Sequence, residues 1–140
     1  MCRMSDHFSL RLKPGTTERL RRRAQRAGTA PRTLAQRYVE EGIRHDDHPL
    51  IHFVDERGGR RARLIGTGLD VWEVVATVRD NANDLSRSTE YLAISQALVE
   101  AAVSYYGNYR DEIDAEITLN TEEWRRGYEA FGAGQRALGA

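Results

Sequence analysis

The sequence predicts a mainly helical protein with short β structure, and three patterns lead to this prediction. A short segment that alternates polar and apolar side chains, from His7 to Leu12, precedes two basic amphipathic stretches. Further amphipathic stretches fill most of residues 70–131. Two β-prone stretches lie between these parts and flank a turn that contains Gly58 and Gly59. We therefore expect one N-terminal strand, several helices and one small β-hairpin.

The N-terminal strand is expected to need a second copy of the chain. Phe8, Leu10 and Leu12 would fall on one face of an extended segment, because side chains alternate along a strand. Pro14 and Gly15 then end this segment. A lone strand has no neighbour to hydrogen-bond within its own subunit. The pattern therefore predicts a homodimer in which two N-terminal strands pair.

Two helices are expected after this strand. Thr16 or Thr17 can cap the first helix, which would end at Gly28, since glycine readily adopts the left-handed conformation that follows many helices. Thr29 can cap the second helix, with Pro31 in its first turn and an end near residue 44. Together with the strand, these helices define a first domain at residues 1–45.

The remainder is expected to form a helical domain at residues 46–117 and a tail at residues 118–140. Asn120 and Glu123 resemble a capping pair, which predicts that a new helix begins in the tail. Trp72 is a core candidate of the helix expected at residues 70–78. The other expected elements span residues 51–54, 62–65, 86–93, 95–106, 109–117 and 120–131.

Charge is divided unevenly along the chain, although the formal net charge is zero. Residues 1–45 carry 11 Arg and Lys against 4 Asp and Glu, whereas residues 46–140 carry 10 against 17. An arginine excess of this kind is typical of nucleic-acid binding. The sequence therefore predicts that the first domain, rather than the remainder, contacts nucleic acid.

The first domain resembles the ribbon-helix-helix fold of bacterial repressors and antitoxins. The matching residues are Phe8 to Pro14, Leu20, Ala24, Ala27, Gly28, Leu34, Ala35, Tyr38, Val39 and Ile43. In that fold two strands pair antiparallel and enter the major groove, which is wide enough for a two-stranded ribbon. The resemblance implies that His7, Ser9 and Arg11 face the bases of operator DNA, with Arg11 on guanine.

The resemblance also implies a phosphate site at the start of the second helix, where Thr29 and Arg32 are the candidates. The chain departs from the family at Ala30, where Ser or Thr is common, and at Pro31, which lacks a backbone donor. Arg32 can compensate by its charge. The alternative is a strand that completes a dimer core without contacting DNA.

Residues 48–117 resemble a small uncharacterised bacterial domain that recurs in VapB-type antitoxins and in proteins encoded beside PIN-like ribonuclease toxins. The residues that carry this resemblance are His48-Pro49, Gly59 to Arg63, Gly66-Thr67, Val71-Trp72, Tyr91-Leu92, Val99, Ala102, Tyr105-Tyr106 and Glu112 to Asp114. The resemblance implies a helix-turn-helix core with a small hairpin. Residues 86–106 are then a second candidate for DNA contact. Exposed positions at residues 96–104 offer no Arg or Lys, which favours a packing role.

Four arginines surround the expected hairpin, and two roles for them remain open. They can bind phosphate, or they can form salt bridges to Asp70 or Glu73. These arginines are Arg57, Arg60, Arg61 and Arg63.

The tail carries an aromatic pattern that predicts binding of a protein partner. Trp124, Tyr128 and Phe131 recur at i, i+4 and i+7, which is the spacing of anchors on a helix that lies in a groove. Aromatic side chains are also common energetic centres of interfaces. Antitoxins of the resembled architecture tend to block a toxin with such a tail. The alternative is that the aromatic residues fold back on their own domain.

Metal and enzyme chemistry find little support in the sequence. His45, His48 and His52 with Asp46 and Asp47 are better explained as a polar linker, and Cys2 is the only cysteine. The chain contains no phosphate loop, nucleophile elbow or paired histidines on a helix. The acidic run at residues 111–116 is expected to be a solvated face. We expect no cofactor and a cytoplasmic protein.

These patterns predict an antitoxin of a type II toxin–antitoxin system. It would neutralise a PIN-like ribonuclease toxin by direct binding and repress its own operon by binding operator DNA. The first alternative is a stand-alone transcriptional regulator. The second is a nuclease that dimerises through its N-terminal strand and uses Asp111 or Asp114.

Overall fold

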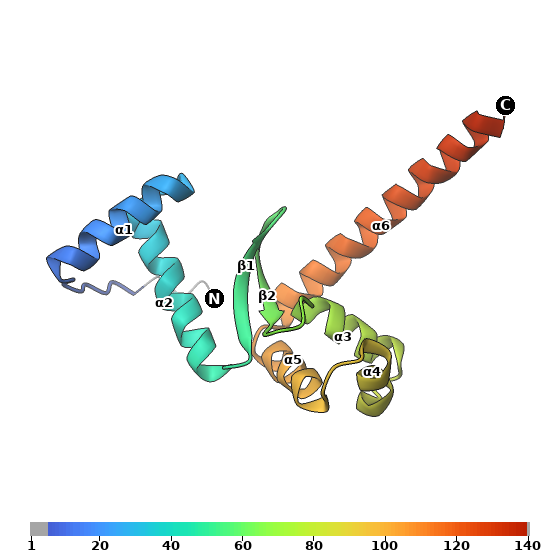
Figure 1. Cartoon of the computed structure of the whole chain (residues 1–140), viewed down its shortest axis with the longest axis horizontal. Coiled ribbons are helices and arrows are strands. Elements are labelled where there is room, and N and C mark those ends of the chain that lie inside the picture. Colours follow the sequence, from blue (N-terminus) through green and yellow to red (C-terminus); the bar gives the residue numbers. More distant parts are fainter. Residues whose placement is uncertain (1–5, 140) are drawn as a thin grey trace. The chain divides into compact units, whose positions relative to one another are not determined.

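The computed structural model describes residues 6–139, which form six helices and one β-hairpin (Figure 1). The elements in chain order are α1 (Pro14–Ala27), α2 (Pro31–Asp47), β1 (Ile51–Glu56), β2 (Gly59–Leu64), α3 (Val71–Asp80), α4 (Leu85–Leu92), α5 (Gln96–Asn108) and α6 (Arg110–Gly139). The chain divides into two compact units, of which the first ends at Ile43 and the second begins at Arg44. None of the described helices is long and apolar enough to cross a membrane.

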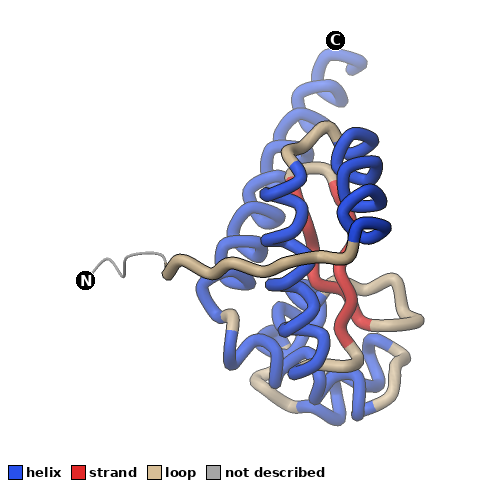
Figure 2. Tube along the Cα trace, turned by 90° about the vertical axis from the view of Figure 1, so that its left-hand side faces the viewer, coloured by secondary structure: helices blue, strands red, loops and turns tan. Residues whose placement is uncertain are grey.

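The predicted fold class is wrong, because residues 6–13 form no strand and the N-terminal part is not a ribbon-helix-helix. These residues lead into α1 without regular structure (Figure 2). The sheet within residues 6–139 contains β1 and β2 alone. An extended segment becomes a strand only when a neighbouring strand exchanges backbone hydrogen bonds with it. Both strands of the hairpin instead pair with each other, so the N-terminal segment lacks such a neighbour within the described chain.

Helix α1 begins earlier than the sequence pattern predicts, whereas α2 begins at Pro31, which was expected in its first turn. Pro14 occupies the first turn of α1, where its missing N–H costs nothing, and Lys13 is the N-cap residue. Thr17 does not cap the helix, because its hydroxyl donates to the Lys13 carbonyl at 3.3 Å. The predicted end of α1 is confirmed, since Gly28 has a left-handed φ of 66°.

The first unit has a small core. Ala24 and Leu34 are the buried apolar side chains that α1 and α2 contribute. Larger apolar side chains of this unit stay exposed, and they are Phe8, Leu10, Leu12, Tyr38, Val39 and Ile43. Chains of about 40 residues seldom bury enough surface to be stable without further support. The unit therefore has an apolar face that its own residues do not cover.

The second unit is built on the predicted hairpin, which is confirmed. The strands pair antiparallel from Ile51 opposite Leu64 to Glu56 opposite Gly59. Arg57 and Gly58 form the two-residue connection, and Gly58 supplies a φ of 96° that suits a tight turn. Leu64 and Ile51 are fully buried, so the paired strands begin inside the core and reach solvent at the turn.

Helices α3 and α5 and the start of α6 complete this core. Its buried members are Ile51, Ala62, Leu64, Val71, Val74, Val75, Val78, Val99, Ala102, Tyr105 and Ile113. Asp70 and Glu73 form a capping box at α3, and the Asp84 side chain caps α4. The predicted N-cap of α5 is confirmed, since the Ser95 hydroxyl accepts from the Leu98 N–H at 3.4 Å.

Helix α6 is one continuous helix, so the predicted helix start at Asn120 is wrong. The Asn120 amide lies within α6 and donates to the Glu116 carbonyl at 2.8 Å, which leaves it no capping role. Ile113 is buried and Ile117 packs against the core, whereas residues 121–131 are exposed. The helix therefore has a proximal part that packs on the unit and a distal part that extends beyond it (Figure 1).

Candidate interaction surfaces

The first candidate surface is the arginine-rich exterior of α1. Its exposed cations are Arg19, Arg21, Arg22, Arg23 and Arg26. Arg22 pairs with Glu18 at 3.2 Å. Within residues 6–139, Arg21, Arg23 and Arg26 form no ion pair. Unpaired arginines on one helix are suited to phosphate, because contact with them releases the counterions of a nucleic acid.

The residues predicted to contact DNA lie in two places along the chain, before α1 and at the start of α2. His7, Ser9 and Arg11 are exposed in the segment before α1, where His7 Nε2 and Ser9 Oγ lie 3.0 Å apart. Without a strand, alternation no longer assigns these side chains to one face. Thr29 is half-buried between the helices, and Arg32 is exposed in the first turn of α2.

An apolar hollow opens beside the arginines of α1, and we call it the N-terminal groove. Its volume is about 310 Å³. Carbon atoms make up most of its lining, which consists of Leu10, Leu12, Thr16, Arg19, Leu20, Arg23, Ala35, Tyr38 and Val39. The groove coincides with the uncovered apolar face of the first unit.

The second candidate surface is the aromatic stripe, which consists of Trp124, Tyr128 and Phe131 on the distal part of α6. These side chains are 71%, 66% and 64% exposed, respectively. The rings of Trp124 and Tyr128 stack with centroids 5.3 Å apart. Because positions three or four apart share a helix face, the stripe continues the face on which Ile113 and Ile117 pack. The same face of α6 is thus packed against the core in its proximal part and exposed to solvent in its distal part.

Three of the four arginines around the hairpin lie on β2 and form ion pairs, as the salt-bridge alternative expects, whereas Arg57 is exposed in the turn. Arg60 pairs with Asp55 at 3.1 Å, and Arg61 Nη1 lies 3.7 Å from Glu116 Oε1. Arg63 donates to Asp70 at 2.8 Å and also pairs with Glu56. Hydrogen bonds to Asp70 and Glu56 raise the pKa of Arg63. The hairpin thus joins its neighbours through these cations.

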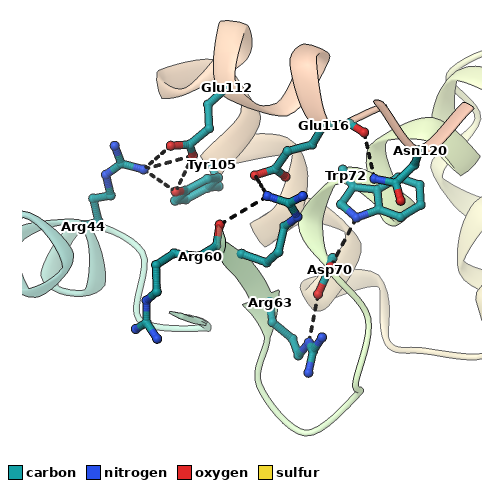
Figure 3. A network of polar contacts seen from close by, with 10 residues as sticks. Arg44, Arg60, Arg63, Asp70, Trp72, Tyr105, Glu112, Glu116 and Asn120 are labelled. Carbon is teal, nitrogen blue, oxygen red and sulfur yellow. Dashed lines mark hydrogen bonds and ion pairs between the residues drawn. The ribbon is translucent and has the colours of Figure 1, made fainter. Parts of the chain in front are cut away.

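Asp70 connects the hairpin to α3. The Asp70 side chain is buried, and its two oxygens accept from different partners. Arg63 Nε donates to Oδ1 at 2.8 Å, and Trp72 Nε1 donates to Oδ2 at 3.2 Å (Figure 3). The Asp70 N–H donates to Glu73 at 2.8 Å. Glu73 therefore caps α3 and does not pair with an arginine. The hydrogen bond to Asp70 fixes the orientation of the Trp72 indole.

Glu116 is a buried carboxyl at the contact between β2 and α6. Its exposed fraction is 7%, and Oε2 has no hydrogen-bond partner within the described residues. Burial raises the pKa of Glu116 to about 7, against the opposing effect of Arg61. The negative charges of Glu112 and Asp70 raise the pKa further. This carboxyl therefore titrates close to neutral pH.

Arg44 anchors a second polar cluster. It donates to the Tyr105 hydroxyl at 2.8 Å and to Glu112 at 3.0 Å (Figure 3). Its guanidinium lies over the Tyr109 ring, 3.9 Å from the centroid. Burial alone would lower the pKa of Arg44, but the hydrogen bonds to Tyr105 and Glu112 raise it overall. The cluster packs α5 against the start of α6.

The acidic run of α6 points in several directions. Glu112 faces Arg44 and Glu116 faces Arg61, whereas Asp114 accepts from Arg79 at 2.5 Å. Hydrogen bonds from Tyr106 and Arg79 lower the pKa of Asp114. Within the described part of the chain, no three His, Cys, Asp or Glu side chains are grouped to hold a metal ion.

A further hollow, which the sequence did not indicate, lies where the aromatic stripe begins. Its volume is about 620 Å³, and its lining consists of Trp72, Asn120, Thr121, Glu123 and Trp124. We call it the tryptophan hollow. Trp72 was expected in the core but is only partly buried, because Asp70 holds the indole N–H at the surface of α3. No local pattern reveals this, since the two tryptophans are 52 positions apart in sequence.

Comparison of the chain with family models, with curated proteins and with solved structures gives no match.

Proposed function

We propose that this protein is an antitoxin of a type II toxin–antitoxin system. In this proposal the distal part of α6 binds and occludes a PIN-like ribonuclease toxin, and the first unit binds operator DNA to repress the operon. The observation that carries the proposal is the aromatic stripe, which continues a packed helix face into solvent. A groove on a partner would cover this face in the way that the core covers its proximal end.

The composition of distal α6 supports binding of a helix in a groove. The periodicity of the helix places Glu122, Arg126 and Glu129 opposite the stripe. Arg125 and Arg136 lie beside it. Gly127 and Gly134 each lower the stability of an exposed helix by about 1 kcal/mol relative to alanine. The helix therefore gains most of its stability from a partner that buries the aromatic side chains.

The first unit supports the DNA-binding part of the proposal through charge. Residues 6–43 contain nine Arg and Lys residues but only four Asp and Glu residues. The arginines of α1 are exposed, and four of the five have no ion pair within the described residues. Such a surface contacts phosphates rather than base edges. Operator preference would then come from spacing and DNA shape as well as from side chains such as Arg11 and Arg32.

We further propose that a second copy of the chain closes the N-terminal groove. Two buried side chains, Ala24 and Leu34, are too few for a unit of this size, whereas the groove offers Leu10, Leu20 and Val39 to a partner. A homodimer would also present two basic helices, which suits the repeated half-sites of an operator.

Co-expression with the product of the neighbouring reading frame tests the antitoxin proposal. We expect the two proteins to co-purify and the chain to relieve the growth arrest that the partner causes. The double variant Tyr128→Ala/Phe131→Ala should lose both effects, because aromatic anchors are worth about 2 kcal/mol or more each. Leu119→Ala is the matched control, since Leu119 is exposed on another face of α6 and should leave the complex intact.

Two results would contradict the proposal. The first is the absence of any complex between the wild-type chain and the neighbouring gene product. The second is equal co-purification of the double variant and the control. DNA binding without a protein partner would instead favour the stand-alone regulator.

A further inference from the structure

We propose that the tryptophan hollow binds the guanidinium group of an arginine on the protein partner. This inference rests on the proposed function, in which a partner covers the aromatic stripe that begins at Trp124. The hollow lies at the proximal end of the stripe, where α3 and α6 meet. A partner helix or loop that binds the stripe would therefore lie next to the opening of the hollow.

Most hydrogen-bond donors of the hollow are already used within the chain. Trp72 Nε1 donates to Asp70 at 3.2 Å (Figure 3). The Asn120 amide and the Thr121 hydroxyl donate to main-chain carbonyls one turn earlier in α6, at 2.8 Å and 2.9 Å. The indole N–H of Trp124 is the lining side-chain donor that has no partner within the described residues. The hollow therefore has few free hydrogen-bond donors for a ligand that carries acceptors, such as an anion.

The acceptors of the hollow remain available. The Asn120 amide oxygen and the Glu123 carboxylate have no partner among residues 6–139, and the Thr121 hydroxyl keeps its acceptor capacity. No lining residue is a cation. The matching ligand is thus positively charged and rich in donors.

A guanidinium fits this chemistry better than an ammonium. It carries five N–H donors and no acceptor, and its flat surface stacks on aromatic rings. Two indoles border the hollow, and indole is the strongest aromatic partner for a cation. Lysine has a compact and strongly hydrated charge, so it gains less from flat rings.

The surroundings hold this hollow in shape before any ligand arrives. Arg63 fixes Asp70, and Asp70 fixes the indole of Trp72. Trp124 is steadied on its other side by stacking on Tyr128. A site whose rings are already oriented loses less conformational entropy on binding.

Intrinsic fluorescence of the full chain provides a direct test, because Trp72 and Trp124 are the only tryptophans and both line the hollow. The probes are N-acetyl-arginine amide, its neutral isostere N-acetyl-citrulline amide, and N-acetyl-lysine amide, titrated at constant ionic strength. We expect a saturable change with the arginine probe. The citrulline and lysine probes should bind several-fold more weakly.

Two matched variants assign the effect to the hollow. Glu123→Gln should weaken binding of the arginine probe roughly two- to fivefold, as expected for loss of an exposed ion pair, and should leave the citrulline probe unchanged. Glu122→Gln removes the same charge from an adjacent position of α6 that does not line the hollow, and it should change neither.

Three results would overturn this inference: no saturable change, equal binding of the arginine and citrulline probes, or equal effects of the two variants. These measurements use the chain without a partner. A failure here leaves the co-purification result untouched, and a failure of co-purification leaves the arginine titration untouched.

Discussion

The arginines of α1 and those of β2 are similar in sequence and differ in their surroundings. Arg21, Arg23 and Arg26 extend from an exposed helix without an ion pair inside residues 6–139. Arg61 and Arg63, two positions apart on one strand, each meet a buried carboxylate. The same residue type therefore provides a free positive surface in one unit and joins structural elements in the other.

The difference shows why charge along a sequence does not measure the charge that a partner meets. In β2, alternation sends Ala62 and Leu64 into the core and leaves Arg61 and Arg63 on the other face. Elements distant in sequence then supply Glu116 and Asp70 to that face. No element of the first unit supplies comparable carboxylates to Arg21 or Arg26 within the described residues. The counterions of those arginines must come from solvent or from a polyanion.

The largest effect that this comparison predicts is on stability. Arg63→Ala would leave the buried Asp70 carboxylate without its guanidinium partner, so we expect the free energy of unfolding to fall by about 2 kcal/mol. Urea unfolding measures this change. Arg57→Ala at the exposed hairpin turn is the matched control and should change stability by less than about 0.5 kcal/mol. Equal losses in the two variants would show that the β2 arginines do not join elements as described.

The next effect is on DNA affinity. The double variant Arg21→Ala/Arg26→Ala should keep the thermal stability of the wild type. The slope of log K against log salt for duplex DNA should become shallower by about 2, since each phosphate contact contributes close to one unit. The duplex would be the region upstream of the gene, with an unrelated sequence for comparison.

Arg57→Ala/Arg87→Ala removes two exposed arginines from the second unit and is the control for this measurement. It should leave the salt slope unchanged. If this variant flattened the slope as much as the α1 variant, the basic surface would not be confined to the first unit.

The smallest effect concerns pH and the pair of Arg61 with Glu116. The folded-state pKa of about 7 lies above the ordinary value near 4.5, so the folded protein holds a proton there that the unfolded chain releases. This contribution to stability is complete below about pH 4.5 and is lost as the pH rises through 7. We expect the free energy of unfolding of Glu116→Gln to rise by about 1 kcal/mol relative to that of the wild type between pH 6 and pH 8.

Denaturant midpoints across this pH range check the expectation. Glu122→Gln, at an exposed position of the same helix, should run parallel to the wild type. A constant difference between Glu116→Gln and wild type at every pH would show that burial does not govern this carboxyl.

Local signals in the sequence predicted the parts that depend on near neighbours. Gly28 ends α1, Ser95 caps α5, and the glycine turn defines the hairpin, because each of these choices is made within a few residues. The N-terminal strand failed because a strand requires a neighbour that residues 6–139 do not provide. The helix start at Asn120 failed because its amide bonds the preceding turn of α6 instead of an N-terminus.

The candidate surfaces divide in the same way, into one that near neighbours in sequence define and one that distant elements form together. The aromatic stripe was visible as a period of three and four along one helix, and the structure shows those residues exposed. The tryptophan hollow was not visible, because it joins α3 to α6 through an orientation of Trp72 that Asp70 and Arg63 determine.

The continuity of α6 has a consequence for reach. At a rise of 1.5 Å per residue, the part from residue 118 to residue 139 extends about 33 Å, roughly the diameter of a small domain. A protein held at Phe131 would therefore lie about 20 Å along the helix from Thr118, where the distal part begins. A bulky ligand could then occupy the far end of the helix while the hairpin side of the second unit stays open to other molecules.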